Sequence, residues 1–180
     1  MIPAVNIDDL PLEHWTRGER YESSDLSIGD RLGLTMLGIS INVVPPGKSG
    51  CPFHNHRCED EIFIILEGEG TYRFGSEVRP IRAGDVLGAP AGGQETAHQI
   101  LNTGTGPLRY FALSNQSIAD VCEYPDSGKF QSMARRPSGS RAPDGQTKRS
   151  TISNFSTSTR PLSEIRRLGI TTSASSECCM

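Results

Sequence analysis

Three of the four histidines and one acidic residue have spacings that can build a metal site. His54 and His56 are separated by one residue, Glu61 follows five positions later, and His98 comes much further along the chain. Residues i and i+2 of a β-strand point to the same face, so the first two imidazoles are expected to enter the same space. His98 must reach this space through the fold. His14 lies outside the set and is expected at the surface.

These side chains suit a divalent metal ion of intermediate softness. Neutral imidazoles supply nitrogen, while a carboxylate supplies oxygen and offsets positive charge. Four protein ligands on an octahedral ion leave two positions for a substrate or for oxygen, which is typical of catalytic rather than structural sites. The sequence therefore predicts one ion of Fe, Mn, Ni, Co or Zn bound by His54, His56, Glu61 and His98.

Other residues near the histidines are alternatives as ligands. On a strand, Asp60 would point away from the face of Glu61, and Glu59 shares that face but is expected in the preceding turn. Cys51 and Cys58 flank the two histidines and can act as soft ligands or redox sensors. More often, such cysteines are simply small, partly buried side chains that act neither as ligands nor as sensors.

The elements that must position these residues are short strands. The chain has 19 Gly and 12 Pro in 180 residues, which favours frequent turns over long helices. Short strands with turns between them indicate a sandwich or barrel rather than βαβ units. The predicted strands are Leu32–Val44, Glu61–Leu66, Thr71–Phe74, Glu77–Ile81, Val86–Ala89, Ala97–Leu101 and Leu108–Leu113.

The strand Glu61–Leu66 is apolar on both faces. Phe63 and Ile65 form one face, and the other face is formed by Ile62, Ile64 and Leu66. A strand with two apolar faces is expected to be covered on both. The opposite barrel wall would cover one face, and the N-terminal arm or a second subunit would cover the other.

Two ordered motifs in this region resemble those of the cupin family. The first runs His-x-His, four residues, Glu, six residues, Gly, and the second runs Gly, five residues, Pro-x-Gly, then His and, after three residues, Asn. The first is matched here by His54, His56, Glu61 and Gly68. The second is matched by Gly84, Pro90, Gly92, His98 and Asn102, with five residues instead of two before the histidine. The extra residues, Gly93–Ala97, are expected to lengthen a loop at the barrel mouth.

The resemblance implies an all-β fold, the cupin double-stranded β-helix or jelly-roll barrel, with a bound metal. The chain looks most like small single-domain cupins with a Tyr-Pro-Asp-Ser-Gly-Lys run after the barrel, here Tyr124–Lys129. Dioxygenase, isomerase and lyase chemistries all occur in cupins, and the fold does not choose among them. We expect a metal-dependent enzyme acting on a small oxygen-rich molecule such as a sugar, hydroxy-carbonyl or phenol. The alternative is a non-catalytic module that binds or senses a small molecule. Some of five polar strand residues are expected to line the cavity: Tyr72, Arg73, Arg79, Gln99 and Tyr110.

Composition divides the chain into four segments. Residues 1–30 form an N-terminal arm, 31–115 the barrel, and 116–135 a segment that packs on the barrel. Residues 136–180 are basic and rich in Ser and Thr, and such a tail is expected to be disordered apart from a short helix at Pro161–Leu168.

Charge and cysteine content limit the kinds of partner and the cellular compartment that we expect. The net charge of −3 combines an acidic body with the basic tail, so nucleic acid and membranes are not expected partners. The N-terminus lacks the pattern of a signal peptide, and the odd number of cysteines disfavours a secreted disulfide framework. We expect a cytoplasmic protein that binds a small molecule and forms a homodimer through its apolar strand.

Overall fold

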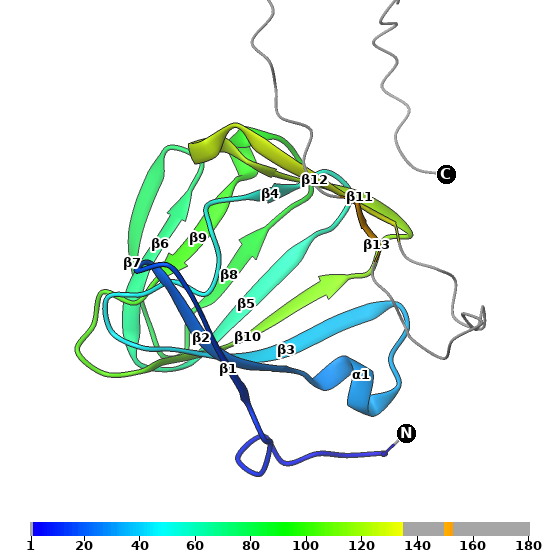
Figure 1. Cartoon of the computed structure of the whole chain (residues 1–180). Coiled ribbons are helices and arrows are strands. Elements are labelled where there is room, and N and C mark those ends of the chain that lie inside the picture. Colours follow the sequence, from blue (N-terminus) through cyan, green and yellow to red (C-terminus); the bar gives the residue numbers. More distant parts are fainter. Residues whose placement is uncertain (1, 135–149, 153–180) are drawn as a thin grey trace, which may run out of the picture.

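The computed structural model describes residues 2–134 and 150–152, whose regular secondary structure consists almost entirely of β-strands (Figure 1). The all-β prediction is therefore confirmed for this part of the chain. The disordered tail and the helix at Pro161–Leu168 lie outside the described residues. The elements in chain order are β1 (Glu13–Arg17), β2 (Tyr21–Ser27), α1 (Ile28–Leu32), β3 (Leu37–Val44), β4 (Asn55–His56), β5 (Glu61–Glu67), β6 (Glu69–Phe74), β7 (Glu77–Arg82), β8 (Val86–Ala89), the 3₁₀ turn η1 (Gln94–Thr96), β9 (His98–Leu101), β10 (Leu108–Asn115), β11 (Ala119–Tyr124), the 3₁₀ turn η2 (Pro125–Ser127), β12 (Lys129–Ala134) and β13 (Ser150–Ile152).

Antiparallel sheets form the barrel. The largest has the strand order β1-β2-β3-β10-β5-β8, and a second has the order β7-β6-β9. One apolar core joins the two sheets, with buried side chains from β3, β5, β6, β7, β8, β9 and β10. The third sheet, β13-β12-β11-β4, lies at one end of the barrel, at the top of Figure 1.

The alternation predicted for the apolar strand is confirmed in β5. Phe63 and Ile65 are buried in the barrel core. Ile62, the second residue of the strand, is 47% exposed. On the outer face, Leu66 packs against a second apolar cluster that includes Leu10 of the N-terminal segment. The N-terminal segment thus covers part of the outer face, and the end near Ile62 stays open.

The N-terminal region is more regular than predicted. Residues 1–30 were expected to be an arm, but β1 and β2 extend the large sheet, with β2 paired antiparallel to β3. The strand predicted from Leu32 is wrong in its first part, because α1 ends at Leu32 and β3 begins only at Leu37. Ser27 caps this helix by accepting a hydrogen bond from the Asp30 N–H, and Gly33 ends it with a φ of 73°. No helix in the described part of the chain is long and apolar enough to cross a membrane.

The glycine of the first motif has a steric role. Gly68 alone separates β5 from β6 and has a φ of 85°. A Cβ atom at this position would lie 2.3 Å from the Pro107 carbonyl oxygen. Only glycine combines this conformation with such a close approach of two backbones. The residue thereby fixes the path of β5, the strand that carries Glu61.

Candidate metal centre

Three separate segments bring the four predicted ligands together. His56 lies on β4, and Glu61 is the first residue of β5. His54 forms an isolated bridge with His98, the first residue of β9. In this bridge the His54 N–H donates to the His98 carbonyl at 3.1 Å, and the His98 N–H donates back at 2.7 Å. The backbone therefore fixes the separation of these two histidines.

The three imidazoles turn the same ring nitrogen towards one carboxylate oxygen. The Nε2 atoms of His54 and His56 each lie 3.6 Å from Glu61 Oε2, and His98 Nε2 lies 2.9 Å from it. One ligand atom from each of His54, Glu61 and His98 falls within 4.8 Å of the others. The structure thus brings together all four residues selected from the sequence, in an arrangement suited to a metal ion. Their role as ligands remains a prediction.

The other ring nitrogen of each histidine has a hydrogen-bond acceptor. His54 Nδ1 lies 2.9 Å from the Pro52 carbonyl oxygen, and His98 Nδ1 lies 3.3 Å from that of Thr96. His56 Nδ1 lies 2.5 Å from the carboxylate of Asp120. Because these acceptors carry no proton, each neutral imidazole donates from Nδ1 and turns its Nε2 lone pair to the centre, as in metal-binding histidines.

The residues inserted before His98 take part in this arrangement. Gly93–Ala97 contains η1, and Thr96 within it supplies the acceptor for His98 Nδ1. The Ala97 carbonyl in turn accepts from the Gly75 N–H at 2.8 Å, which ties the insertion to the barrel. The longer spacing therefore orients the third histidine instead of displacing it.

Two buried atoms at the centre have no hydrogen-bond partner among the described residues. These are Glu61 Oε2 and His98 Nε2, which are close together without being aligned as a hydrogen bond. Buried polar atoms are rarely left unsatisfied, and an unseen ion is one common explanation. A cation bound between them would satisfy both atoms, so the residues present fit a divalent metal.

Burial and neighbouring charges set the protonation states. Burial raises the pKa of Glu61, but the surrounding imidazoles outweigh it and hold this pKa far below its usual range. Burial lowers the pKa of His98. Burial also lowers that of His54, although contacts with Cys51 and Glu61 outweigh it and raise this pKa. The centre therefore combines a carboxylate with a neutral His98, a state that can accept a cation.

The structure also places the alternative acids. Asp60 is exposed, and its carboxylate accepts a hydrogen bond from the Ala91 N–H at 2.8 Å. Glu59 is buried and accepts from the Ser117 N–H at 3.0 Å, and its carboxylate lies within 4.8 Å of ligand atoms of His56 and Asp120. The Glu61 carboxylate faces the Nε2 atoms of all three histidines. Cys51 and Cys58 are both half-buried.

Sequence reasoning missed Asp120 on β11. Burial raises the pKa of this carboxyl, but hydrogen bonds from His56 and from the Cys58 N–H outweigh it and lower the pKa. Asp120 lies 64 residues from His56 in the sequence, so no local spacing could have linked the two. Its position after the last motif-bearing strand gave no signal by itself.

Aromatic residues form a wall beside the centre. The ring centroids of Phe63 and Tyr72 lie 5.3 Å and 6.4 Å from that of His98. Of the five polar residues expected to line the cavity, Tyr72 and Tyr110 are buried in the barrel core. Arg79 is exposed and pairs with Glu77.

The other two of these five residues, Arg73 and Gln99, form a polar group with Asp126. The Arg73 guanidinium donates to Gln99 Oε1 at 2.9 Å and to both carboxylate oxygens of Asp126 at 2.9 and 3.1 Å. It also lies 4.1 Å from the centroid of the Phe53 ring. Asp126 belongs to the Tyr124–Lys129 run, so these contacts hold that run against β6.

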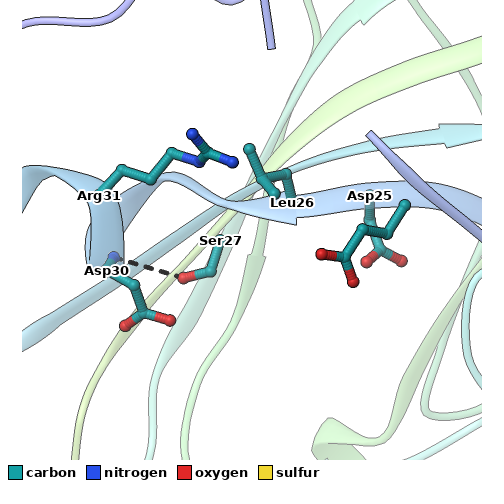
Figure 2. Close-up of a pocket in the computed structure, with 6 residues that line it drawn as sticks. Asp25, Leu26, Ser27, Asp30 and Arg31 are labelled. Carbon is teal, nitrogen blue, oxygen red and sulfur yellow. Dashed lines mark hydrogen bonds between the residues drawn. The ribbon is translucent and has the colours of Figure 1, made fainter. Parts of the chain in front are cut away.

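Two surface hollows lie outside the centre. A hollow of about 470 Å³ runs beside η1 and η2 and is lined by Phe53, which precedes His54 in the chain. A second hollow, of about 330 Å³, lies beside α1 (Figure 2). Its lining includes Asp25, Leu26, Ser27, Asp30 and Arg31, and the dashed line in Figure 2 is the capping hydrogen bond between Ser27 and the Asp30 N–H. Neither hollow is lined by any of the four candidate ligands.

Comparison with known proteins gives matches over the barrel. Residues 41–114 match the family model of the cupin domain. An oxalate-binding protein from Thermotoga maritima is 40% identical over 70 residues, which cover 39% of this chain and 54% of that protein. The chain thus spans about half the length of the curated relatives it matches.

Two solved structures extend the likeness. A candidate sugar phosphate isomerase from Acidithiobacillus ferrooxidans is 30% identical with a TM-score of 0.63, covering 72% of this chain and 82% of that one. A predicted oxalate decarboxylase from Thermotoga maritima is 28% identical with a TM-score of 0.55, covering 63% of this chain and 99% of that one. Together with the motif-bearing barrel, these matches show that the chain belongs to the cupin family.

Proposed function

We propose that this cupin is a metal-dependent enzyme that acts on a small oxygen-rich molecule. The observation that carries the proposal is the convergence of three Nε2 atoms on Glu61 Oε2. Two atoms at this point, Glu61 Oε2 and His98 Nε2, are buried without a hydrogen-bond partner among the described residues. A divalent ion held by His54, His56, Glu61 and His98 accounts for both features.

The protein would supply orientation and partial exclusion of water. The His98 side chain is only 3% exposed and lies against Phe63, so this side of the centre is closed. His54, His56 and Glu61 keep 11–16% of their side-chain surface accessible, which leaves an approach for a small molecule. When bound, the metal would act as a Lewis acid on a substrate oxygen.

The relatives support substrates with neighbouring oxygen atoms. Their names concern oxalate and sugar phosphates, which both carry oxygen atoms on adjacent carbons or on one phosphate group. Such a molecule can place two oxygens in the two positions that four protein ligands leave on an octahedral ion. Isomerase, lyase and dioxygenase reactions all fit this mode of binding, with Fe, Mn, Ni, Co or Zn as the ion.

A second candidate is a binding module without turnover. It is favoured by one observation, the 40% identity to an oxalate-binding protein over the barrel region. In this case the same four residues would hold the metal and a dicarboxylate would complete its coordination. The two candidates differ in whether the ligand leaves the protein unchanged.

The first experiment is elemental analysis of the purified full chain, with His56→Ala as the comparison. About one equivalent of metal, lost in H56A, is the expected result. The metal-loaded protein is then incubated with oxalate and with sugar phosphates, with and without oxygen, and the mixtures are analysed by NMR. New products support the enzyme, whereas a thermal shift with oxalate recovered intact supports the binding module. Failure to bind metal after reconstitution would contradict both.

A further inference from the structure

One face of strand β11 is directed towards the metal centre. This strand follows the part of the chain that matches the family model of the cupin domain. That match ends at residue 114, and β11 begins at Ala119. Cys122 pairs directly with His56 across the antiparallel β4–β11 ladder. Directly opposed residues in such a ladder point to the same face, and so do alternate residues of one strand. Asp120, Cys122 and Tyr124 therefore share the face on which the His56 side chain lies.

Contacts agree with this placement. Asp120 and Cys122 are 4% and 3% exposed, and the Tyr124 ring centroid lies 6.2 Å from that of His54. The neighbouring residue Glu123 has the opposite orientation and holds Asn55 and Arg57 instead. The strand thus has one face directed to the metal centre and one that only secures β4.

Asp120 makes two hydrogen bonds that leave it no freedom to turn. Its Oδ2 accepts from His56 Nδ1 at 2.5 Å, and its Oδ1 accepts from the Cys58 N–H at 2.8 Å. A carboxylate has no proton to donate, so the imidazole must carry its proton on Nδ1. The Nε2 lone pair of His56 is then directed to Glu61.

His56 differs from the other two histidines in the group that accepts the hydrogen bond from its Nδ1 atom. His54 and His98 are held by the carbonyls of Pro52 and Thr96, each only two residues upstream. Those contacts are made by the backbone, which no side-chain substitution removes. Of the three Nδ1 atoms, only that of His56 has a side-chain acceptor, and that side chain comes from a distant strand.

We infer that Asp120 is a positioning residue of the metal centre, which sets the tautomer of His56 and makes metal affinity depend on β11. The inference rests on the proposed metal function. Carboxylate partners of ligating histidines commonly change metal affinity by about 10- to 100-fold when they are removed. The cupin barrel by itself would then hold an incomplete centre, with one histidine free to adopt the wrong tautomer.

The test uses Asp120→Asn in the full chain. The Asn oxygen can keep the hydrogen bond from the Cys58 N–H, which turns the amide NH₂ towards His56 Nδ1. That group donates, so the His56 proton is expected to move to Nε2 and block the metal. Long-range ¹H–¹⁵N NMR of the metal-free protein reports the tautomer, with H56Q used to assign the signals. Zinc(II) affinity, measured by competition with a chelating dye, is expected to fall by about 10- to 100-fold.

Glu123→Gln is the matched control, because Glu123 lies on the same strand and touches no candidate ligand. The zinc affinity of E123Q is expected to stay within about threefold of that of the unmodified protein. This change is much smaller than the loss expected when the carboxylate partner of a ligating histidine is removed. The same small change in D120N, or a proton on Nε2 of His56 in the unmodified metal-free protein, would overturn the inference. The second measurement needs no variant, so it decides the matter even if D120N does not fold. If the unmodified protein binds no zinc but shows the Nδ1 proton, the proposed function fails while the contact between Asp120 and His56 stands.

Discussion

Glu61 Oε2 lies 2.9 Å from His98 Nε2, and both atoms are buried without a hydrogen-bond partner among the described residues. A carboxylate and an imidazole at this distance would normally share a proton. The Thr96 carbonyl oxygen can only accept, so its contact with His98 Nδ1 at 3.3 Å assigns the proton of the neutral imidazole to Nδ1. The two facing atoms are therefore both electron-pair donors, which is unfavourable in the protein alone and favourable around a cation.

Added metal is therefore expected to stabilise the fold. At a metal concentration of 100 times Kd, binding adds about 2.7 kcal/mol to the free energy of unfolding. For a domain of this size that is a rise in Tm of roughly 5–10 °C, reversed by a chelator. His98→Ala should lose most of the rise. His14→Ala should keep it, because His14 is exposed on β1 and contacts Ser24. An equal rise in both variants would show that the metal binds elsewhere.

The choice of Glu61 over its neighbours can be tested directly. Glu61→Gln keeps the size of the side chain but removes its charge. Metal affinity should fall at least about tenfold, because the loss of a residue that only hydrogen-bonds to a metal ligand already costs about that much. Asp60→Asn should leave the affinity unchanged, because its oxygen can still accept from the Ala91 N–H. Metal titration by calorimetry compares the two variants. A large loss in D60N with none in E61Q would reverse the assignment.

The barrel was predictable because local patterns agree with the final packing. In β5 the alternation predicts that Phe63 and Ile65 share one face and that Ile62 lies on the other, and the exposures agree, although the cover expected over Ile62 is not found among the described residues. The position of Glu61 at the start of the same face follows from the same alternation. The convergence of the histidines was also predictable in outline, since i and i+2 residues share a face.

The remaining elements depend on contacts that are distant in sequence. Strands β1 and β2 are polar, with sequences EHWTR and YESSDLS, and no apolar alternation marks them. β2 is a strand because β3 offers it an edge to pair with, and β1 pairs in turn with β2. Helix α1 has only 5 residues, and the alternation of Leu32, Leu34 and Met36 resembles a strand. The partnership of Asp120 with His56 belongs to the same class, because the pairing of β11 with β4 creates it.

Acid should weaken the attachment of β4 to β11 through Glu123. Burial raises the pKa of this carboxyl, but hydrogen bonds from Arg57 and Asn55 outweigh it and hold the pKa below its usual value of 4.5. A carboxyl with a lower pKa in the folded than in the unfolded state stabilises the fold above the unfolded value, and the contribution is lost as the pH falls through the folded value. Glu123→Gln should therefore cost about 1 kcal/mol at pH 7, or roughly 2–4 °C in Tm.

The difference between the two proteins should shrink below pH 4.5 as Glu123 itself becomes protonated. Thermal melts of the metal-free proteins across this pH range measure it. A difference that stays constant down to acid pH would mean that the charge of Glu123 contributes nothing to the fold.

The open end of the outer sheet face predicts a homodimer. Leu37, Ile62 and Val86 lie on β3, β5 and β8 and are 58%, 47% and 66% exposed. Ile62 is paired with Leu113 on β10, which continues the apolar surface between these strands. Exposed apolar residues gathered on one face commonly mark an interface, and a symmetric dimer would bury the same patch on both copies. Light scattering should therefore give twice the chain mass of 19.5 kDa.

Ile62→Glu should halve that mass, because a charge on this face cannot be buried without a partner. The side chain points away from the barrel core, so the monomer should keep its fold and its metal affinity. Val78→Glu is the control, since Val78 is 66% exposed on β7, outside the large sheet. A monomeric mass for the unmodified protein would contradict the dimer, and the exposed face would then have to be covered by something other than a second copy.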